Sequence, residues 1–261
     1  MIDDNLVRKD VKSSTLKKIT KSEVEIMLEP TKGDRVYSGI KGATSLIPIV
    51  GGAVSELFSV GVNSPMQQRR DKILVWYDNR LKQLEDSGLI KIDDLLSDQK
   101  FIDIISQSIL LAVQNSQEEK IQLLKKFLLS YVLKPDVDHD RKIMFLRTIE
   151  NLTLTHYTIL KTMYEPKEII TKFVKDNAWL DYSDVNFEVM KSFGTYLDID
   201  EEMLWISLDE LATWQLVKDY KRNIGGSEGY TTEQAIERLV TVTHESLTKY
   251  AFEFFKFLDE Y

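Results

Sequence analysis

Few side chains of this sequence could do acid–base or metal chemistry, because its 261 residues include three histidines and no cysteine. Imidazole and thiolate groups supply many of the nucleophiles, general bases and transition-metal ligands of proteins. The lack of cysteine excludes disulfides, thiolate zinc sites, iron–sulfur clusters and cysteine nucleophiles. The chemistry that remains depends on the setting of each histidine.

His139 lies in the acidic run Asp136–Asp140, which offers oxygen ligands of the kind that calcium binds. A calcium loop also needs further oxygen ligands and a glycine at its sharp turn, and both are missing here. Acidic residues are typical of a helix N-terminus, where the helix dipole favours negative charge. We therefore interpret the run as the start of a helix, and we predict neither a metal nor a cofactor.

The other two histidines also lack catalytic partners in the sequence. His156 follows Thr155 on a short apolar helical stretch, which is typical of a packed or capping side chain. His244 and Glu245 fall inside the predicted second strand, where alternation places neighbouring side chains on opposite faces. The glycine-rich stretch 225–229 lacks the lysine of a phosphate-binding loop, and no nucleophile elbow or dinucleotide fingerprint occurs. We predict no catalytic residues and a protein that is not an enzyme.

The elements that carry these residues are mostly predicted helices. Pro65 suits a first helical position and Gly88 suits a helix end, while Ser116 with Glu119, and Thr153 alone, match N-terminal caps. No alternation of strands and helices occurs, which disfavours a doubly wound sheet. The pattern predicts helices over 65–87, 98–114, 116–134, 138–150, 154–164, 167–177 and 183–193, the last ended by Gly194.

The last part of the chain differs in pattern. Ser207 with Glu210 matches a capping box for a helix over 207–217, and Thr248 matches the cap of a final helix. Between them, Val217–Tyr220 and the threonine-rich Leu239–Thr243 are predicted as two strands of one hairpin. We thus predict a mainly α fold, with a helical bundle-like part and a winged-helix-like C-terminal module. The predicted divisions are a basic lead over 1–33, a helical domain over 34–182 and the module over 183–261.

Charge disfavours nucleic acid as a partner. The formal net charge is −8, and the predicted helix over 207–217 carries Asp209 and Glu210 without any lysine or arginine. Basic residues occur at Lys218, Lys221 and Arg222 on the predicted hairpin, so a DNA-binding regulator remains a further alternative. The first 22 residues hold six basic and three acidic residues, a composition we interpret as a solvated end of the chain.

One apolar stretch, residues 45–62, invites comparison with a membrane span. It contains Pro48, Gly51, Gly52 and Glu56, and a charged residue at mid-bilayer is costly. We predict a buried or half-buried helical hairpin, and conditional membrane insertion is the alternative. Together with Arg69 and Arg70, these residues form the candidate interaction or membrane surface. Because the first residues contain no apolar signal-peptide core, we expect a cytoplasmic protein.

Four blocks in a fixed order resemble a known family, and they are Ile47–Phe58 with Pro65, Arg69 and Arg70 after it, Phe145–Leu160, Leu208–Val217 and Leu247–Leu258. This order is similar to that of bacterial proteins related to the abortive-infection alpha type, with Ala251 in place of a common glycine. The resemblance implies a winged-helix-like end, no catalytic residues, and a role in defence against bacteriophage. The function we expect is that of a non-enzymatic bacterial protein acting through protein–protein contacts, with an unknown protein or a second copy as partner.

Overall fold

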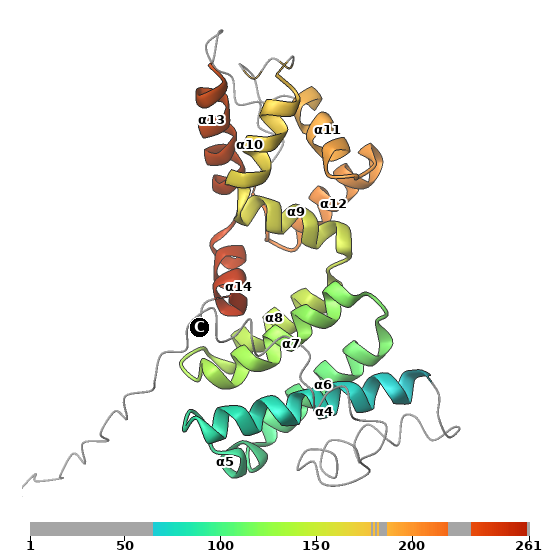
Figure 1. Cartoon of the computed structure of the whole chain (residues 1–261), viewed down its shortest axis with the longest axis vertical. Coiled ribbons are helices and arrows are strands. Elements are labelled where there is room, and N and C mark those ends of the chain that lie inside the picture. The colour runs from blue at the N-terminus through green and yellow to red at the C-terminus, as the bar shows by residue number, and fades with distance from the viewer. Residues whose placement is uncertain (1–64, 179, 181, 183–186, 219–230, 260–261) are drawn as a thin grey trace, which may run out of the picture.

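The computed structural model describes residues 65–178, 180, 182, 187–218 and 231–259, and these residues form eleven α-helices without any β-strand. The mainly α fold is therefore confirmed for this part of the chain. The helices, shown in Figure 1, are α4 (Pro65–Asp86), α5 (Ile92–Leu96), α6 (Gln99–Gln114), α7 (Glu118–Leu133), α8 (His139–Asn151), α9 (Leu154–Tyr164), α10 (Pro166–Asp176), α11 (Phe187–Tyr196), α12 (Glu201–Thr213), α13 (Thr232–Glu245) and α14 (Lys249–Asp259).

The helices stack in chain order, and the last helix returns to the middle. Figure 1 shows α4, α5 and α6 at one end, α7 and α8 next to them, and α10, α11 and α13 at the other end. The closely packed pairs are α6 with α4 and α7, α9 with α12, and α10 with α13. The final helix, α14, packs on α7 although more than a hundred residues separate them.

Aromatic side chains of α14 join it to three earlier helices. The ring of Phe257 lies 5.7 Å from that of Phe127 on α7 and 5.0 Å from that of Phe145 on α8, while Phe255 stacks on Tyr164 of α9 at 4.4 Å. Removal of each such ring from water contributes about 1.5–3 kcal/mol to the free energy that stabilises the fold. Ala251, the departure from the resembled family, is fully buried in α14, so its methyl group is accommodated.

A second hydrophobic cluster lies apart from this main core. It is centred on Phe173 of α10, whose ring meets Phe193 at 4.9 Å and Tyr196 at 5.4 Å. Ala235 and Leu239 of α13 close its other side. The main core contains residues from Ile73 to Leu258, and the predicted domain boundary between residues 182 and 183 stays a prediction.

At the C-termini of four described helices, backbone carbonyls accept hydrogen bonds from a lysine of another element. Helix ends leave carbonyl groups without an intrahelical donor and carry partial negative charge, so an ammonium group is stabilising there. The ammonium-to-carbonyl distances run from 2.6 to 3.1 Å. Lys142 caps α7 at Tyr131, Lys120 caps α8 at Glu150 and Leu152, Lys134 caps α14 at Lys256 and Phe257, and Lys218 caps α13 at Glu245.

The predicted strand Leu239–Thr243 is wrong, because these residues lie inside α13. A capping box of Thr231 and Gln234 starts the helix, and Ala235 and Leu239, one turn apart, pack into the second cluster. Burial of this helical face outweighs the β-propensity of Val240–Thr243. Of the predicted first strand, Val217 forms a single antiparallel bridge with Leu247, while residues 219 and 220 lie outside the described residues.

Several predicted helix ends are confirmed and others are wrong. The caps at Thr153 and Thr248 are confirmed, since their hydroxyls accept from the backbone N–H of His156 and Ala251. Helix α4 ends before Gly88, which adopts a positive φ of 72° as expected. The Ser116 cap is wrong, because α7 follows Gln117 without a side-chain cap.

Helix α12 begins earlier than predicted. Asp200 caps it by accepting from the backbone N–H groups of Glu202 and Met203, and Ser207 is buried in its middle. The Ser207–Glu210 capping box is therefore wrong. Ser207 has the spacing to an acidic residue that a capping box requires, but it lies inside the helix, where it packs as a buried residue.

Gly194 does not end α11 but lies within it, close to Leu204 of α12. A Cβ atom at this position would lie 2.6 Å from Leu204 Cδ2, so glycine permits the close approach of the two helices. Asp198, with a positive φ of 59°, is the residue that turns the chain after α11.

Candidate functional site

The candidate surface predicted from the sequence is described in part. Pro48, Gly51, Gly52 and Glu56 lie outside the described residues, as does all of the 45–62 stretch. In the part that is described, no helix is both long enough and apolar enough to cross a bilayer.

Both arginines of that surface are half-buried and engaged with their own neighbours. The Arg69 Nη1 group donates to the carbonyl of Asn115 at 3.0 Å, at the end of α6. Arg70 donates through Nε and Nη2 to Asp71 Oδ1 at 2.9 and 2.8 Å. These contacts support a structural role for each guanidinium within the helical part.

The His139 segment caps a helix. Asp138 accepts from the backbone N–H of Asp140 and starts α8, as the sequence predicts. The His139 ring meets Tyr131, with the Tyr131 hydroxyl 3.2 Å from Nδ1. Burial, with help from Asp98 and Asp103, raises the pKa of Tyr131 to about 12. Among the described residues, no group of three or more histidine, aspartate or glutamate side chains is placed to hold a metal ion.

Beside this segment lies a buried cation, Lys142, which is 4% exposed. Its ammonium group donates to the Tyr131 carbonyl at 2.9 Å and lies 4.5 Å from the centre of the Tyr131 ring. Burial lowers the pKa of Lys142, and Asp136, Asp138 and Asp98 oppose that shift. The carbonyl needs this donor, because the residue four positions on is Pro135, which has no N–H.

His156 joins α9 to α12. Its ring is buried, lies 4.8 Å from Trp214, and places Nε2 2.9 Å from Oε2 of Glu210. On its other side, Nδ1 accepts from the backbone N–H of Thr153 at 3.1 Å and completes a capping box. Burial lowers the pKa of His156, with the Glu210 carboxylate opposing it. The predicted packed or capping histidine is confirmed, whereas its contacts with Glu210 and Trp214 depend on the packing of α9 against α12.

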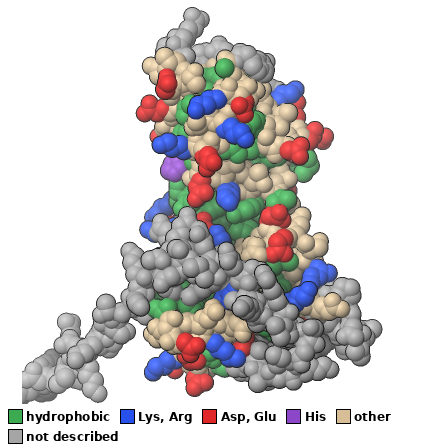
Figure 2. Space-filling model, in the orientation of Figure 1, with side chains coloured by type: hydrophobic (Ala, Val, Ile, Leu, Met, Phe, Trp, Pro, Cys, Tyr) green, Lys and Arg blue, Asp and Glu red, His purple; other side chains and the backbone are tan. Residues whose placement is uncertain are grey.

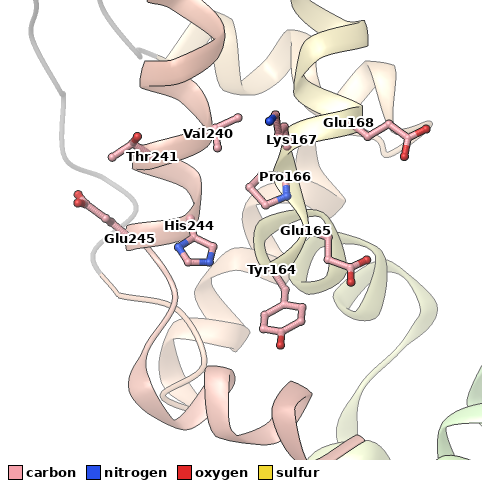
Figure 3. A pocket seen from close by; sticks show the side chains of 9 residues that line it. All are labelled: Tyr164, Glu165, Pro166, Lys167, Glu168, Val240, Thr241, His244 and Glu245. Carbon is pink, nitrogen blue, oxygen red and sulfur yellow. The ribbon is translucent and has the colours of Figure 1, made fainter. Parts of the chain in front are cut away.

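His244 lines an open groove of about 700 Å³, shown in Figure 3. Figure 3 places its ring opposite Tyr164 and Pro166, across the gap between α13 and the junction of α9 and α10. The ring packs edge-on against Phe252 at 4.7 Å. Glu245, from the same turn of α13, points away from His244 in this view, so the two side chains do not form a dyad.

A second open groove, of about 880 Å³, runs along the other side of the same junction. Glu165 and Glu168 line both grooves, and Tyr157, Lys161 and Lys172 line only the second. Burial raises the pKa of Tyr157 to about 12, with Asp259 and Glu165 adding to the shift. In Figure 2 acidic and basic side chains are interspersed over the upper part of the visible face, with apolar side chains exposed between them.

Among the described residues, the solvent face of α12 combines exposed apolar groups with exposed carboxylates. Met203 and Ile206 are 46% and 45% exposed, one helical turn apart. Glu202 and Asp209 are exposed on the same side, opposite the buried Leu204, Ser207, Leu208 and Leu211. The signal in the sequence was the spacing of Met203 and Ile206 in an acidic helix, which places both side chains on one helical face.

No family model, curated protein or solved structure matches this chain. The class of the protein is therefore defined by its geometry alone. The described part is an all-α assembly, and its acidic helix α12 exposes apolar side chains.

Proposed function

We propose that this chain is a non-enzymatic binding protein and that the exposed face of α12, formed by Glu202, Met203, Ile206 and Asp209, is its docking surface. We call this the α12 face. Large apolar side chains exposed next to one another on a helix are typical of protein-interaction sites. A partner that covers Met203 and Ile206 removes them from water, and the flanking carboxylates favour a partner with basic groups.

The single observation that carries the proposal is the pairing of Met203 and Ile206 in an acidic surrounding. Burial of this pair gains hydrophobic free energy at about 25 cal/mol for each Å² removed from water. The carboxylates add specificity and association rate more than affinity. A winged-helix-like role in DNA binding is not favoured, because α12 carries four acidic residues and no basic one, and residues 239–243 are helical.

For the biological setting, we propose a bacterial phage-defence component of the abortive-infection alpha type. This part of the proposal is supported by the order of sequence blocks described above. The alternative of a membrane-inserting effector depends on residues 45–62, outside the described residues.

The test combines a phage-plaquing assay with co-purification from infected and uninfected bacteria. We expect wild type to reduce plaque formation and to retain a partner, and Met203→Lys with Ile206→Lys to lose both. The matched control is Met144→Lys, because Met144 is equally exposed, at 45%, on α8. If the double variant protects and retains its partner as wild type does, the α12 face is not the docking surface. If wild type gives no protection, the defence role is rejected.

A further inference from the structure

The solvent side of α10, with the residue just before it, carries charged side chains in a regular order. Four of them follow one another at intervals of three, four and three residues, which places them along one side of the helix. Buried residues of the second hydrophobic cluster occupy the opposite side. In chain order the four are Glu165, Glu168, Lys172 and Lys175, all of them exposed. This surface, which we call the α10 face, is therefore acidic in its first half and basic in its second.

The charges of the α10 face are not neutralised within the described part of the chain. None of the four side chains makes an ion pair or a side-chain hydrogen bond with another described residue. Glu168 and Lys172 are spaced for an ion pair within the helix, but they do not form one. The α10 face thus presents charges of both signs to solvent, in two separate halves.

An open groove beside the α10 face supplies apolar surface. This groove, of about 880 Å³, has Glu165, Glu168 and Lys172 in its wall. Leu154, which is 41% exposed, lines the same groove together with Ile169. Exposed ion pairs contribute little affinity, whereas apolar area removed from water contributes more. A partner that fits here must therefore cover apolar groups as well as match the order of the charges.

The order of charges on the α10 face is complementary to itself. When two copies of α10 lie antiparallel, with a two-fold axis at the level of residue 170, Glu165 of one copy faces Lys175 of the other. In the same arrangement Glu168 faces Lys172, and the two-fold symmetry repeats both pairs. All four charges of each copy then meet an opposite charge. In a parallel arrangement the acidic halves would face each other and repel.

We propose that this chain forms a homodimer through the α10 face, with the two α10 helices antiparallel. The charges set the register and the orientation, and each copy covers Leu154 and Ile169 of the other. Because the ion pairs lie at the surface, the dimer weakens as ionic strength rises. The α10 face and the α12 face belong to different helices, so the dimer does not depend on the proposed docking function.

Sedimentation velocity of the full-length chain tests the proposal, because it measures the oligomeric state in solution. We expect a monomer–dimer equilibrium that shifts toward the monomer at high salt. Glu165→Lys with Glu168→Lys makes the α10 face wholly basic, and Lys172→Glu with Lys175→Glu makes it wholly acidic. Each of these double variants is expected to weaken the dimer about a hundredfold, since like charges then meet at every position.

Two further samples separate loss of the interface from loss of folding. A mixture of the wholly basic and wholly acidic variants is expected to form a heterodimer, because their charges are opposite at every position. Glu168→Lys with Lys172→Glu exchanges the two central charges, keeps every pair opposite, and is expected to dimerise as wild type does. Glu233→Lys with Glu237→Lys, at exposed positions of α13, is the matched control and should also leave the dimer unchanged.

Three outcomes would overturn the proposed dimer. The first is a wild type that stays monomeric at every concentration at low salt. The second is a wholly basic or wholly acidic variant that dimerises as wild type does. The third is an exchange variant that is monomeric although its circular-dichroism spectrum equals that of wild type. None of them affects the co-purification test of the α12 face.

Discussion

His156 shows how one buried side chain can serve two helices. Its Nδ1 accepts a hydrogen bond from Thr153, which assigns the proton of the neutral ring to Nε2, the atom that faces Glu210. A second proton on the ring would have to go to Nδ1, where it would replace that hydrogen bond. Burial therefore favours the neutral form and lowers the pKa, although the Glu210 carboxylate attracts the charged form.

The lowered pKa of His156 makes stability depend on pH. The unfolded chain, with a pKa near 6.5, takes up a proton before the folded chain does. Stability from this group is thus present above pH 6.5 and is lost as pH falls toward the folded pKa, with a slope of at most about 1.4 kcal/mol per pH unit. We expect the difference in unfolding free energy between wild type and His156→Ala to shrink between pH 7 and about pH 5. Urea titrations at each pH measure it, and a constant or growing difference would contradict the assignment.

At the scale of single helices, lysine side chains cap the C-terminal ends of α7, α8, α13 and α14. Lys142 is the clearest case, because Pro135 deprives the Tyr131 carbonyl of its usual helical donor and Lys142 replaces it. The cation is costly to bury, yet its removal leaves a buried carbonyl without a partner. The larger of the two costs decides whether substitution of Lys142 raises or lowers the free energy of unfolding.

We expect Lys142→Met to destabilise the fold by about 1–3 kcal/mol, since the orphaned carbonyl costs more than the desolvated ammonium. Lys100→Met, at an exposed position of α6, is the control and should stay within about 0.5 kcal/mol of wild type. Chemical denaturation measures both. Equal or higher stability of Lys142→Met would mean that burial of the charge is the larger cost.

Gly194 sets the distance between α11 and α12. A methyl group there would lie 2.6 Å from Leu204 Cδ2, and Leu204 is buried, so either the side chain or the helix must shift. We expect Gly194→Ala to cost about 1–3 kcal/mol despite the better helix propensity of alanine. Ser192→Ala in the same helix is the control. A stabilised Gly194→Ala variant would show that the two helices can separate freely.

At the scale of the molecule, two hydrophobic clusters imply two levels of stability. The second cluster, around Phe173, connects α10, α11 and α13, while the main core unites α4 to α9 with α12 and α14. Smaller cooperative units open before the whole protein unfolds. Met190 packs against both clusters and couples them.

We expect Phe173→Leu to accelerate hydrogen exchange in α10 and α13 and to leave α7, α8 and α14 protected. The reason is that the substitution leaves a cavity in the second cluster alone. Hydrogen-exchange mass spectrometry on the intact protein measures this, with Phe127→Leu in the main core as the reference. Equal loss of protection throughout the chain after Phe173→Leu would indicate a single cooperative unit.

Helices with strong periodicity and local caps were predictable from the sequence. The residues at Gly88, Asp138, Thr153 and Thr248 act locally, within one turn of the helix they border, so their effect can be predicted without knowledge of the fold. The segment 239–243 lies in α13, and its helical state was not predictable in this way. Its β-branched residues fit a strand locally, and only the neighbouring α10 makes the helical face favourable.

The candidate site, too, was predictable from the sequence only in part. The sequence by itself determined that the chain has no thiol chemistry, three isolated histidines, an acidic body and a basic lead, since these follow from residue types alone. The tertiary structure decided that Arg69 and Arg70 contact Asn115 and Asp71, that His156 meets Glu210, and that Met203 and Ile206 face solvent. Contacts and exposure depend on which helices pack together, and that packing is a free-energy balance over the whole chain rather than a property of any one segment.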